Sequence, residues 1–368
     1  MRILKGFSVG LVVLFAMAWF APPQGRAAQA AKPAAATAND KGALRIYFVD
    51  VEGGQSTLFV APTGESMLVD TGSPDTRNPN APRDASRIAA VCKIAGVTKI
   101  DNLVVTHYHS DHVGGLPQLV ALVPVGRFID HGPNTEGAEV QGGSSTIAGY
   151  DAYTKVLTDT HADHLSVKPG DVLPIKAFHV EVVSANGDVI AKPLAAGGQP
   201  NPACATSPKK DPEGDENERS VGMVITFDKT RILDLGDLTW AKEPGLVCPV
   251  NKLGKVDVYI ASHHGLDRSG SPALVDAVSP RIAVIDNSGR KGAASTTIDT
   301  IRGSGRLQDL WQLHTAEGND AAHNTAESHI ANLPGTDAGN YLELSVRPNG
   351  SMSVTNPRTG DTVEYPAK

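Results

Sequence analysis

The sequence has little of three things: long apolar runs, cysteine and positive charge. Its longest apolar run, Phe7 to Phe20, is about 15 residues, short of the roughly 20 that a membrane-spanning helix needs. Only 3 cysteines occur in 368 residues, and none is near this run, which argues against a lipoprotein anchor. The net charge of −7 argues against non-specific coating of nucleic acid, because such binding depends on many Lys and Arg contacts to phosphate.

The first thirty residues have the composition of an export signal. Arg2 and Lys5 precede the apolar run, and small residues follow at Ala28-Gln29-Ala30. This order is typical of a signal peptide, residues 1–30, that is cleaved near Ala30, and an uncleaved anchor is the alternative. We therefore expect a periplasmic or secreted protein with no stable membrane anchor after cleavage. Cleavage removes three basic and no acidic residues, so the net charge becomes −10.

The cysteines leave one question open. Cys92 lies in an apolar helical stretch and is expected to be a buried thiol. Cys204 and Cys248 lie in Pro-rich sequence, and they could pair in an oxidising compartment or remain two free thiols.

The order of predicted elements indicates an α/β sandwich. Residues 31–42 lack periodicity and are predicted to be a disordered leader, and residues 43–368 one domain. The domain begins with three short antiparallel strands, and later strands alternate with helices such as 83–95, 146–158, 271–278 and 295–303. Residues 186–220 are polar and rich in Pro and Gly, which predicts a long surface loop.

The segment THYHSDHVGG, Thr106 to Gly115, contains the clearest chemical signal. In an extended segment His107 and His109 project the same way and can hold one ion together. The chain then turns into a helix, which directs Asp111 and His112 toward a second ion. A surface run that is rich in histidine by chance is the alternative, and the strand-loop-helix context favours the metal.

Two later strand ends supply further candidate ligands. LDLGD ends at Asp237, whose carboxylate could bridge two ions, although an ordinary turn aspartate is the alternative. IASHHG ends another strand at His263 and His264. Neighbouring side chains of an extended segment point in opposite directions, so only one of the two is expected to bind metal. We predict that it is His263, the first residue past the strand end. His264 is then left for the substrate or for the residues around the ligands.

These motifs together resemble those of the metallo-β-lactamase-fold hydrolases. The resemblance runs from Leu44 to about Asp286, and it implies an αββα sandwich. More narrowly, DVEGGQS, ENERSVGMVITF, LDLGD and SHHGLDRSGSP look like the hydrolase domain of ComEC-type competence proteins, which handle DNA during uptake.

One departure from that family pattern concerns the third histidine of the first ion. Many members take it from a Gly-His segment that this sequence lacks, and His131, at the end of the strand GRFIDHG, is the predicted substitute. A surface or capping histidine is the alternative. Arg290 and Lys291 lie in a loop where they could meet an anionic substrate, unless they form a solvated basic turn.

The predicted chemistry is hydrolysis at two divalent ions, zinc being expected and manganese or iron the alternatives. A water shared by the ions would be the nucleophile, with Asp111 orienting it and taking its proton. The expected substrate is a small molecule or nucleotide with a phosphodiester or related ester bond, and DNA is not favoured by the charge. Alternatives are a lactone, thioester or β-lactam hydrolase, an iron redox enzyme, or a non-catalytic secreted metal-binding protein. β-Lactamases of this fold generally lack an aspartate at the position of Asp237.

Overall fold

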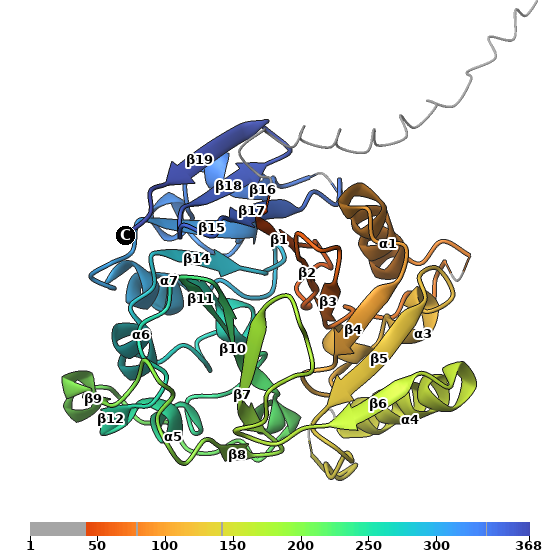
Figure 1. Cartoon of the computed structure of the whole chain (residues 1–368), viewed down its shortest axis with the longest axis horizontal. Coiled ribbons are helices and arrows are strands. Elements are labelled where there is room, and N and C mark those ends of the chain that lie inside the picture. The colour runs from red at the N-terminus through yellow and green to blue at the C-terminus, as the bar shows by residue number, and fades with distance from the viewer. Residues whose placement is uncertain (1–41, 79, 141–142, 336) are drawn as a thin grey trace, which may run out of the picture. The chain divides into compact units, whose positions relative to one another are not determined.

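Two β-sheets packed face to face form the centre of the protein (Figure 1). The computed structural model describes residues 42–78, 80–140, 143–335 and 337–368. The predicted signal peptide and all of the predicted leader except Gly42 lie outside the described residues.

The first sheet has nine strands in the order β19-β18-β17-β1-β2-β3-β4-β5-β6. Its members are β1 Leu44–Phe48, β2 Thr57–Val60, β3 Ser66–Val69, β4 Ile100–Val104, β5 Val125–Asp130, β6 Asp163–Ser166, β17 Leu342–Val346, β18 Met352–Asn356 and β19 Asp361–Tyr365. The strands β1 to β3 are antiparallel as predicted, and β3 to β6 run parallel. Near the C-terminus, β17 pairs with β18 in an antiparallel hairpin around Asn349 and Gly350.

The second sheet has eight strands in the order β16-β15-β14-β13-β11-β10-β7-β8. Its members are β7 His179–Ala185, β8 Asp188–Val189, β10 Gly222–Phe227, β11 Thr230–Asp234, β13 Val258–Ile260, β14 Ile282–Ile285, β15 Asp309–His314 and β16 Ile330–Asn332. From β11 to β16 the strands run parallel. A small separate sheet pairs β9 Gln199–Pro200 with β12 Val250–Asn251.

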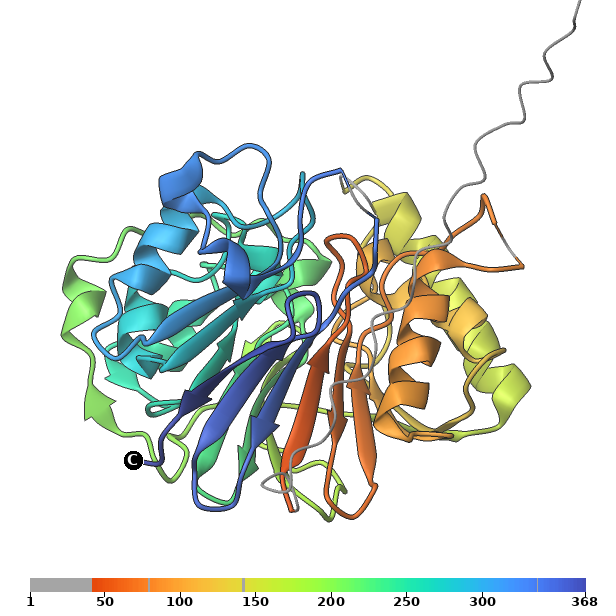
Figure 2. The same ribbon diagram turned by 90° about the horizontal axis from the view of Figure 1, so that it is seen from above.

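Helices cover the outer face of each sheet. Figure 2 shows these layers from above, with the orange and yellow-green helices on one side of the strands and the teal and blue helices on the other. The helices are α1 Arg83–Ala95, α2 Ser110–Val113, α3 Leu116–Leu119, α4 Gly143–Thr160, α5 Glu243–Val247, α6 Pro272–Val278 and α7 Ser295–Arg302, with short 3-10 helices η2 Pro202–Ala205, η3 Glu216–Arg219, η4 Ser262–Gly265, η5 Ala321–His323 and η6 Glu327–His329. The predicted order of helix, sheet, sheet, helix is confirmed.

Alternation along the strands explains the layers. In β1, Ile46 and Phe48 point into the core between the sheets, whereas Tyr47 between them packs in the layer of α1. In β11, Ile232 joins the central core and Leu233 packs against the helices α5 to α7. Burying apolar side chains on both faces of a strand contributes about 25 cal/mol per Å² of apolar surface removed from water, so both sheets need their helical cover.

Parallel strands gather the site at one edge. The carboxyl ends of parallel strands in one sheet lie at the same edge. The loops that follow β4 and β5 in the first sheet, and β11, β13 and β14 in the second, therefore begin close together. The loops that follow these strands contain the histidines and aspartates singled out from the sequence. The fold therefore brings together segments more than 150 residues apart.

Residues 186–220 differ from the predicted surface loop. They contain β8, β9, η2 and η3, and Glu216, Asn217 and Glu218 are buried. Cys204 forms a disulfide with Cys248. The segment is polar yet partly interior because its buried groups are hydrogen-bonded, as Glu216 is to His131 and Ser220 is to the Asp237 backbone. Among the described residues no helix is long and apolar enough to cross a membrane.

Candidate metal centre

The loop after β4 presents four of the predicted ligands. It stays extended through His109, whose φ is −64° and ψ 147°, and then enters α2 at Ser110. This change of direction turns Asp111 and His112 away from the line of the extended segment, as predicted. The loop containing Gly54 packs directly on this turn, because a Cβ at Gly54 would lie 2.2 Å from the Asp111 carbonyl oxygen.

Asp237 follows β11 after a sharp turn. The strand ends at Asp234, three residues earlier than predicted, because Gly236 adopts a φ of 53°. A Cβ at Gly236 would approach the Cβ of Thr106 to 2.9 Å, so the turn lies against the β4 loop. Its close approach positions the Asp237 carboxylate among the histidines.

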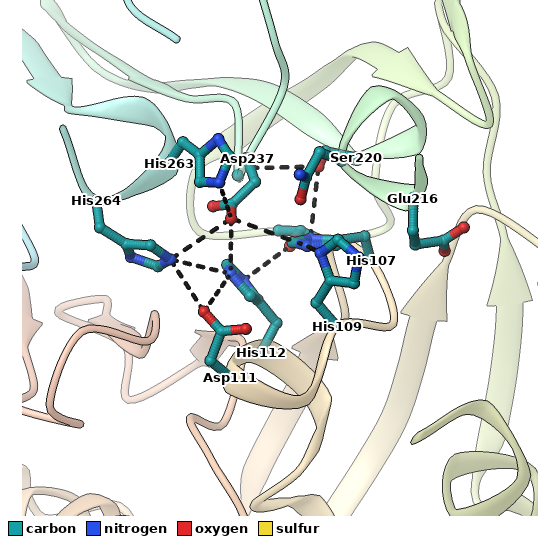
Figure 3. Close-up of polar contacts among 12 residues, drawn as sticks. His107, His109, Asp111, His112, Glu216, Ser220, Asp237, His263 and His264 are labelled. Carbon is teal, nitrogen blue, oxygen red and sulfur yellow. Dashed lines mark hydrogen bonds and ion pairs between the residues drawn. The ribbon is translucent and has the colours of Figure 1, made fainter. Parts of the chain in front are cut away.

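The segment of His263 and His264 is not extended, so the premise for choosing between them was wrong. Both residues have left-handed backbone conformations, with φ values of 56° and 55°. Such conformations cost about 1–3 kcal/mol for a residue other than glycine and are concentrated at functional sites. The consequence is that both rings face Asp237 instead of pointing in opposite directions (Figure 3).

One oxygen of Asp237 lies at the centre of the cluster (Figure 3). Its Oδ2 is 3.2 Å from His112 Nε2, 3.3 Å from His263 Nε2, 3.5 Å from His264 Nε2 and 3.9 Å from His107 Nε2. Its Oδ1 is buried and has no hydrogen-bond partner among the described residues. A buried, unpartnered carboxylate oxygen is costly unless a cation or water completes it.

Four ligand atoms have the spacing of a tetrahedral metal site. Asp111, His112, Asp237 and His264 each offer one atom within 4.8 Å of the others. His264 Nε2 is 3.2 Å from His112 Nε2 and 3.2 Å from Asp111 Oδ2, and His112 Nε2 is 3.5 Å from Asp111 Oδ2. Ligands about 2.0–2.1 Å from a tetrahedral zinc ion would be roughly 3.3–3.4 Å apart. This donor set therefore fits a divalent ion.

His107 and His109 form a second pair beside this group. His107 Nε2 is 3.0 Å from His109 Nδ1, so the two nitrogens face each other across a distance that requires a proton or a cation between them. His107 and His109 would together hold the first ion, and Asp237 lies between the positions of the two ions.

Partners around the ligands set the orientation of their rings. His112 Nδ1 is 2.7 Å from Asp70 Oδ2, which also accepts a bond from the Thr106 hydroxyl at 2.6 Å. Through this contact Asp70 favours a proton on Nδ1 and leaves Nε2 free to bind a metal. On the other side, His264 Nδ1 is 3.5 Å from Asp286 Oδ1. Sequence analysis missed this role of Asp70 and Asp286, although each directly follows an apolar strand, β3 or β14, at the edge of the site.

Segment 186–220 supplies another such partner. Ser220 Oγ is 3.5 Å from His107 Nδ1 and accepts a hydrogen bond from the Asp237 backbone N–H at 3.2 Å. Ser220 thus connects a ligand of the β4 loop with the β11 turn. No signal in the sequence marks it, because a serine in a polar stretch is common.

His131 does not join the cluster. Its Nε2 is 2.7 Å from Glu216 Oε1, both side chains are fully buried, and its ring packs beside Tyr108. In Figure 3 the Glu216 carboxylate points away from His107 and His109. The predicted third ligand instead holds η3, which precedes Ser220, against the end of β5.

Burial and neighbouring charges shift the pKa values of the cluster in different directions. Burial alone would raise the pKa of Asp237, but the neighbouring imidazoles outweigh it and hold this pKa well below its usual range. Burial opposes a charge on His112, yet the carboxylates of Asp237, Asp111 and Asp70 raise its pKa to about 10. Burial lowers the pKa of His107 well below its ordinary value, and the nearby histidines lower it further.

A pocket opens beside the cluster, with a volume of about 440 Å³. Its lining includes His109, Asp111, Asp215, Asp237, Arg268 and Lys291. A larger open pocket of about 600 Å³ lies at the amino ends of β4, β5 and β6, and no histidine is among its described lining residues. The smaller pocket is the candidate substrate site because it alone of the two reaches the cluster.

A second group of candidate ligands contains Asp50, Glu52 and His314. Arg87 lies 3.0 Å from Asp50 Oδ2 and 3.6 Å from Glu52 Oε1, and His314 Nε2 lies 2.7 Å from Asp50 Oδ1. The guanidinium already supplies the positive charge that a metal would bring. This group is therefore an ion-pair network that ties β1 to β15.

Comparison with known families matches residues 50–179 to the Metallo-beta-lactamase superfamily. The matched segment contains the turns between β1, β2 and β3, helix α1 and the whole THYHSDHVGG loop. Together with the αββα arrangement, this match identifies the fold. A search among curated proteins finds no match for the chain.

Several solved structures align with parts of the chain at low identity. A mutant of the β-hydroxylase CmlA is 16% identical, and the alignment covers 74% of this chain and 52% of that one with a TM-score of 0.42. CmlA is a diiron β-hydroxylase from Streptomyces venezuelae. The metallo-β-lactamase SMB-1 is 14% identical over 71% and 85% of the two chains, with a TM-score of 0.37. A diphosphatase of the PhnP family is 13% identical over 66% and 87%, with a TM-score of 0.33. The chain spans about half the length of the CmlA structure.

Proposed function

We propose that this chain, which has the metallo-β-lactamase fold, is a secreted hydrolase that uses two divalent metal ions to cleave a phosphodiester or related ester bond. The observation that carries the proposal is the group of Asp111, His112, Asp237 and His264, whose ligand atoms have metal-site spacing. Zinc is the ion we propose. Manganese and iron are alternatives, because nitrogen and oxygen donors suit all three metals.

The residues of the site would have separate roles. Asp111, His112, Asp237 and His264 would hold one ion, and His107 and His109, with Asp237, the other. When bound, the ions would lower the pKa of a water and polarise the bond under attack. Asp111 lies at the pocket wall with its side chain 22% exposed, so it can orient a water and accept its proton.

The pocket supports an anionic ester as the substrate. Lys291 is part of its lining with a side chain that is 38% exposed, and basic side chains recognise phosphate oxygens. A lactone, thioester or β-lactam remains the second candidate, because the ligand set would also activate water toward a carbonyl. The sequence resemblance to ComEC-type hydrolases supports the first candidate, and the acidic net charge supports a small or nucleotide-sized substrate over long DNA.

An activity panel tests this function. We expect purified, metal-loaded protein to hydrolyse bis(p-nitrophenyl) phosphate, with little turnover of an uncharged lactone or of a β-lactam. Activity should disappear with a chelator and return with zinc. Turnover of the lactone or β-lactam alone would overturn the phosphodiester assignment, and no turnover of any substrate by fully loaded protein would overturn the hydrolase assignment.

Export is proposed from the sequence of residues 1–30. N-terminal sequencing of native protein should find a start near Ala31 in the periplasm or medium. An intact Met1 in the membrane fraction would favour the uncleaved anchor.

A further inference from the structure

We propose that Lys291 forms an anion-binding subsite, in which its ammonium group holds a phosphate oxygen of the substrate beside the metal ligands. The proposal deepens the proposed function and rests on it. Lys291 lies in the pocket lining, and its side chain is 38% exposed. Its Nζ contacts Asp111 Oδ2, so the ammonium already reaches the ligand cluster.

The backbone of Lys291 is fixed relative to the cluster. The turn of residues 288–291 closes through the Ser288 N–H, which donates to the Lys291 carbonyl at 2.9 Å. The next residues bond to the strained histidine turn, because the Ala293 N–H donates to the His264 carbonyl at 2.8 Å. A Cβ at Gly292 would lie 2.2 Å from that carbonyl oxygen, so the two turns are in direct contact. Rotation of the flexible side chain can therefore move the ammonium, while its base stays in position.

A metal ion would compete with Lys291 for Asp111. The same Oδ2 atom is 3.2 Å from His264 Nε2 and 3.5 Å from His112 Nε2 and belongs to the four-atom group. A divalent ion has twice the charge of an ammonium and binds carboxylate oxygen at about 2.0–2.2 Å. It would therefore displace the Lys291 ammonium from Asp111 Oδ2. The ammonium then needs another anion within reach of its four-carbon chain.

The other pocket cation already has its partners. Arg268 donates from Nε to Glu213 Oε1 at 2.8 Å, and its Nη2 is 3.2 Å from Asp215 Oδ2. Among the described lining residues, Arg268 and Lys291 face four carboxylates, those of Asp111, Glu213, Asp215 and Asp237. These side chains have a net negative charge, and two divalent ions would make the net charge of the pocket positive. The loaded pocket would then attract an anion, with Lys291 as the side chain free to contact it.

Binding of inorganic phosphate to metal-loaded protein tests the proposal without requiring turnover. Calorimetric titration should show that Lys291→Gln binds phosphate about tenfold to a hundredfold more weakly than wild type, the effect of losing one hydrogen bond from a charged group. Lys291→Arg keeps the charge and should stay close to wild type. Arg290→Gln is the matched control: it removes a positive charge from the same turn, but Arg290 is 89% exposed and pairs with Glu317. Phosphate affinity should be unchanged in this control.

Metal content and hydrolysis separate the outcomes. All variants should keep the wild-type number of ions. Wild-type phosphate affinity in Lys291→Gln, equal losses in Arg290→Gln, or no phosphate binding by loaded wild type would overturn the subsite. Loss of metal in Lys291→Gln would also overturn it, because Lys291 would then serve Asp111 alone. Lysine-dependent phosphate binding without diester hydrolysis would keep the subsite and reject the proposed function.

Discussion

Asp237 is the residue on which the two halves of the site depend. Asn at this position keeps the size of the side chain but removes the charge that lies among four imidazoles. We expect Asp237→Asn to lose at least one ion per chain and to lower hydrolysis by at least about a hundredfold, the upper end of the loss for an outer partner of a metal ligand. Elemental analysis and activity assays measure both effects.

Asp234→Asn is the matched control for this variant. Asp234 is buried three residues earlier, and Gln55 Nε2 donates to both of its oxygens at 3.0 and 2.9 Å. This variant should lower thermal stability by disturbing that contact while both ions remain. Full metal content and activity in Asp237→Asn would mean that this aspartate is only a turn residue.

His131 gives a prediction with the opposite pattern. His131→Ala leaves the buried Glu216 carboxyl without its 2.7 Å partner, so unfolding should need about 1–3 kcal/mol less free energy, the cost of a buried polar group that loses its hydrogen bond. The number of bound ions should not change. The exposed pair of His179 and Glu181, 3.7 Å apart, is the control, and His179→Ala should cost at most about 1 kcal/mol. Loss of an ion in His131→Ala would restore His131 as a ligand.

Sequence reasoning at the scale of single residues worked where chemistry is local. Three histidines and one aspartate within the six positions from His107 to His112 predict metal ligands, and the structure brings all four side chains into the cluster. The choice between His263 and His264 depended on a backbone conformation that residue types do not reveal. The contact of His131 with Glu216 could not be predicted, because the two residues are 85 positions apart in the chain.

At the scale of elements, Glu243 at the start of α5 fixes the loop that follows the histidine turn. Its buried carboxyl accepts hydrogen bonds from the backbone N–H groups of Gly270 and Ser271, at 2.6 and 2.8 Å. Burial, the largest influence, raises the pKa of Glu243 to about 7, from 4.5. The folded protein therefore holds a proton that the unfolded chain releases between these pH values. Stability from this group is complete below pH 4.5 and is lost as the pH rises toward and past 7.

Glu243→Gln should remove this dependence on pH. Between pH 4.5 and 8, wild type should lose roughly 3 kcal/mol of unfolding free energy relative to the variant, at about 1.4 kcal/mol per pKa unit. Denaturant titrations of both proteins across that range measure the difference, and the metal ligands, common to both, cancel. A difference between the two proteins that is constant with pH would show that Glu243 does not titrate in this range.

Elements with strong periodicity were predictable, and those held by long-range contacts were not. Helix α1 has the predicted bounds, Arg83–Ala95, because its apolar spacing is regular. The polar composition of segment 186–220 predicts a surface position. Glu216 and Ser220 are nevertheless buried, and their hydrogen bonds to His131 and the Asp237 backbone offset the cost.

At the scale of the whole molecule, the parallel strands of two sheets converge on one edge, where seven histidine and aspartate side chains meet. The sequence predicted the layers, since alternating strands and helices must bury apolar faces on both sides. It could not predict the pocket, because Arg268, Lys291 and Asp215 come from three separate loops.

The metal content of the folded wild-type protein tests the central claim most directly. Protein purified without chelator, with folding checked by cooperative thermal unfolding, should contain close to two divalent ions per chain by elemental analysis. Two ions are expected because Asp237 lies between the pair His107 and His109 and the group formed with Asp111, His112 and His264. One ion or none in fully folded protein that has been offered zinc, manganese and iron would contradict the two-metal site.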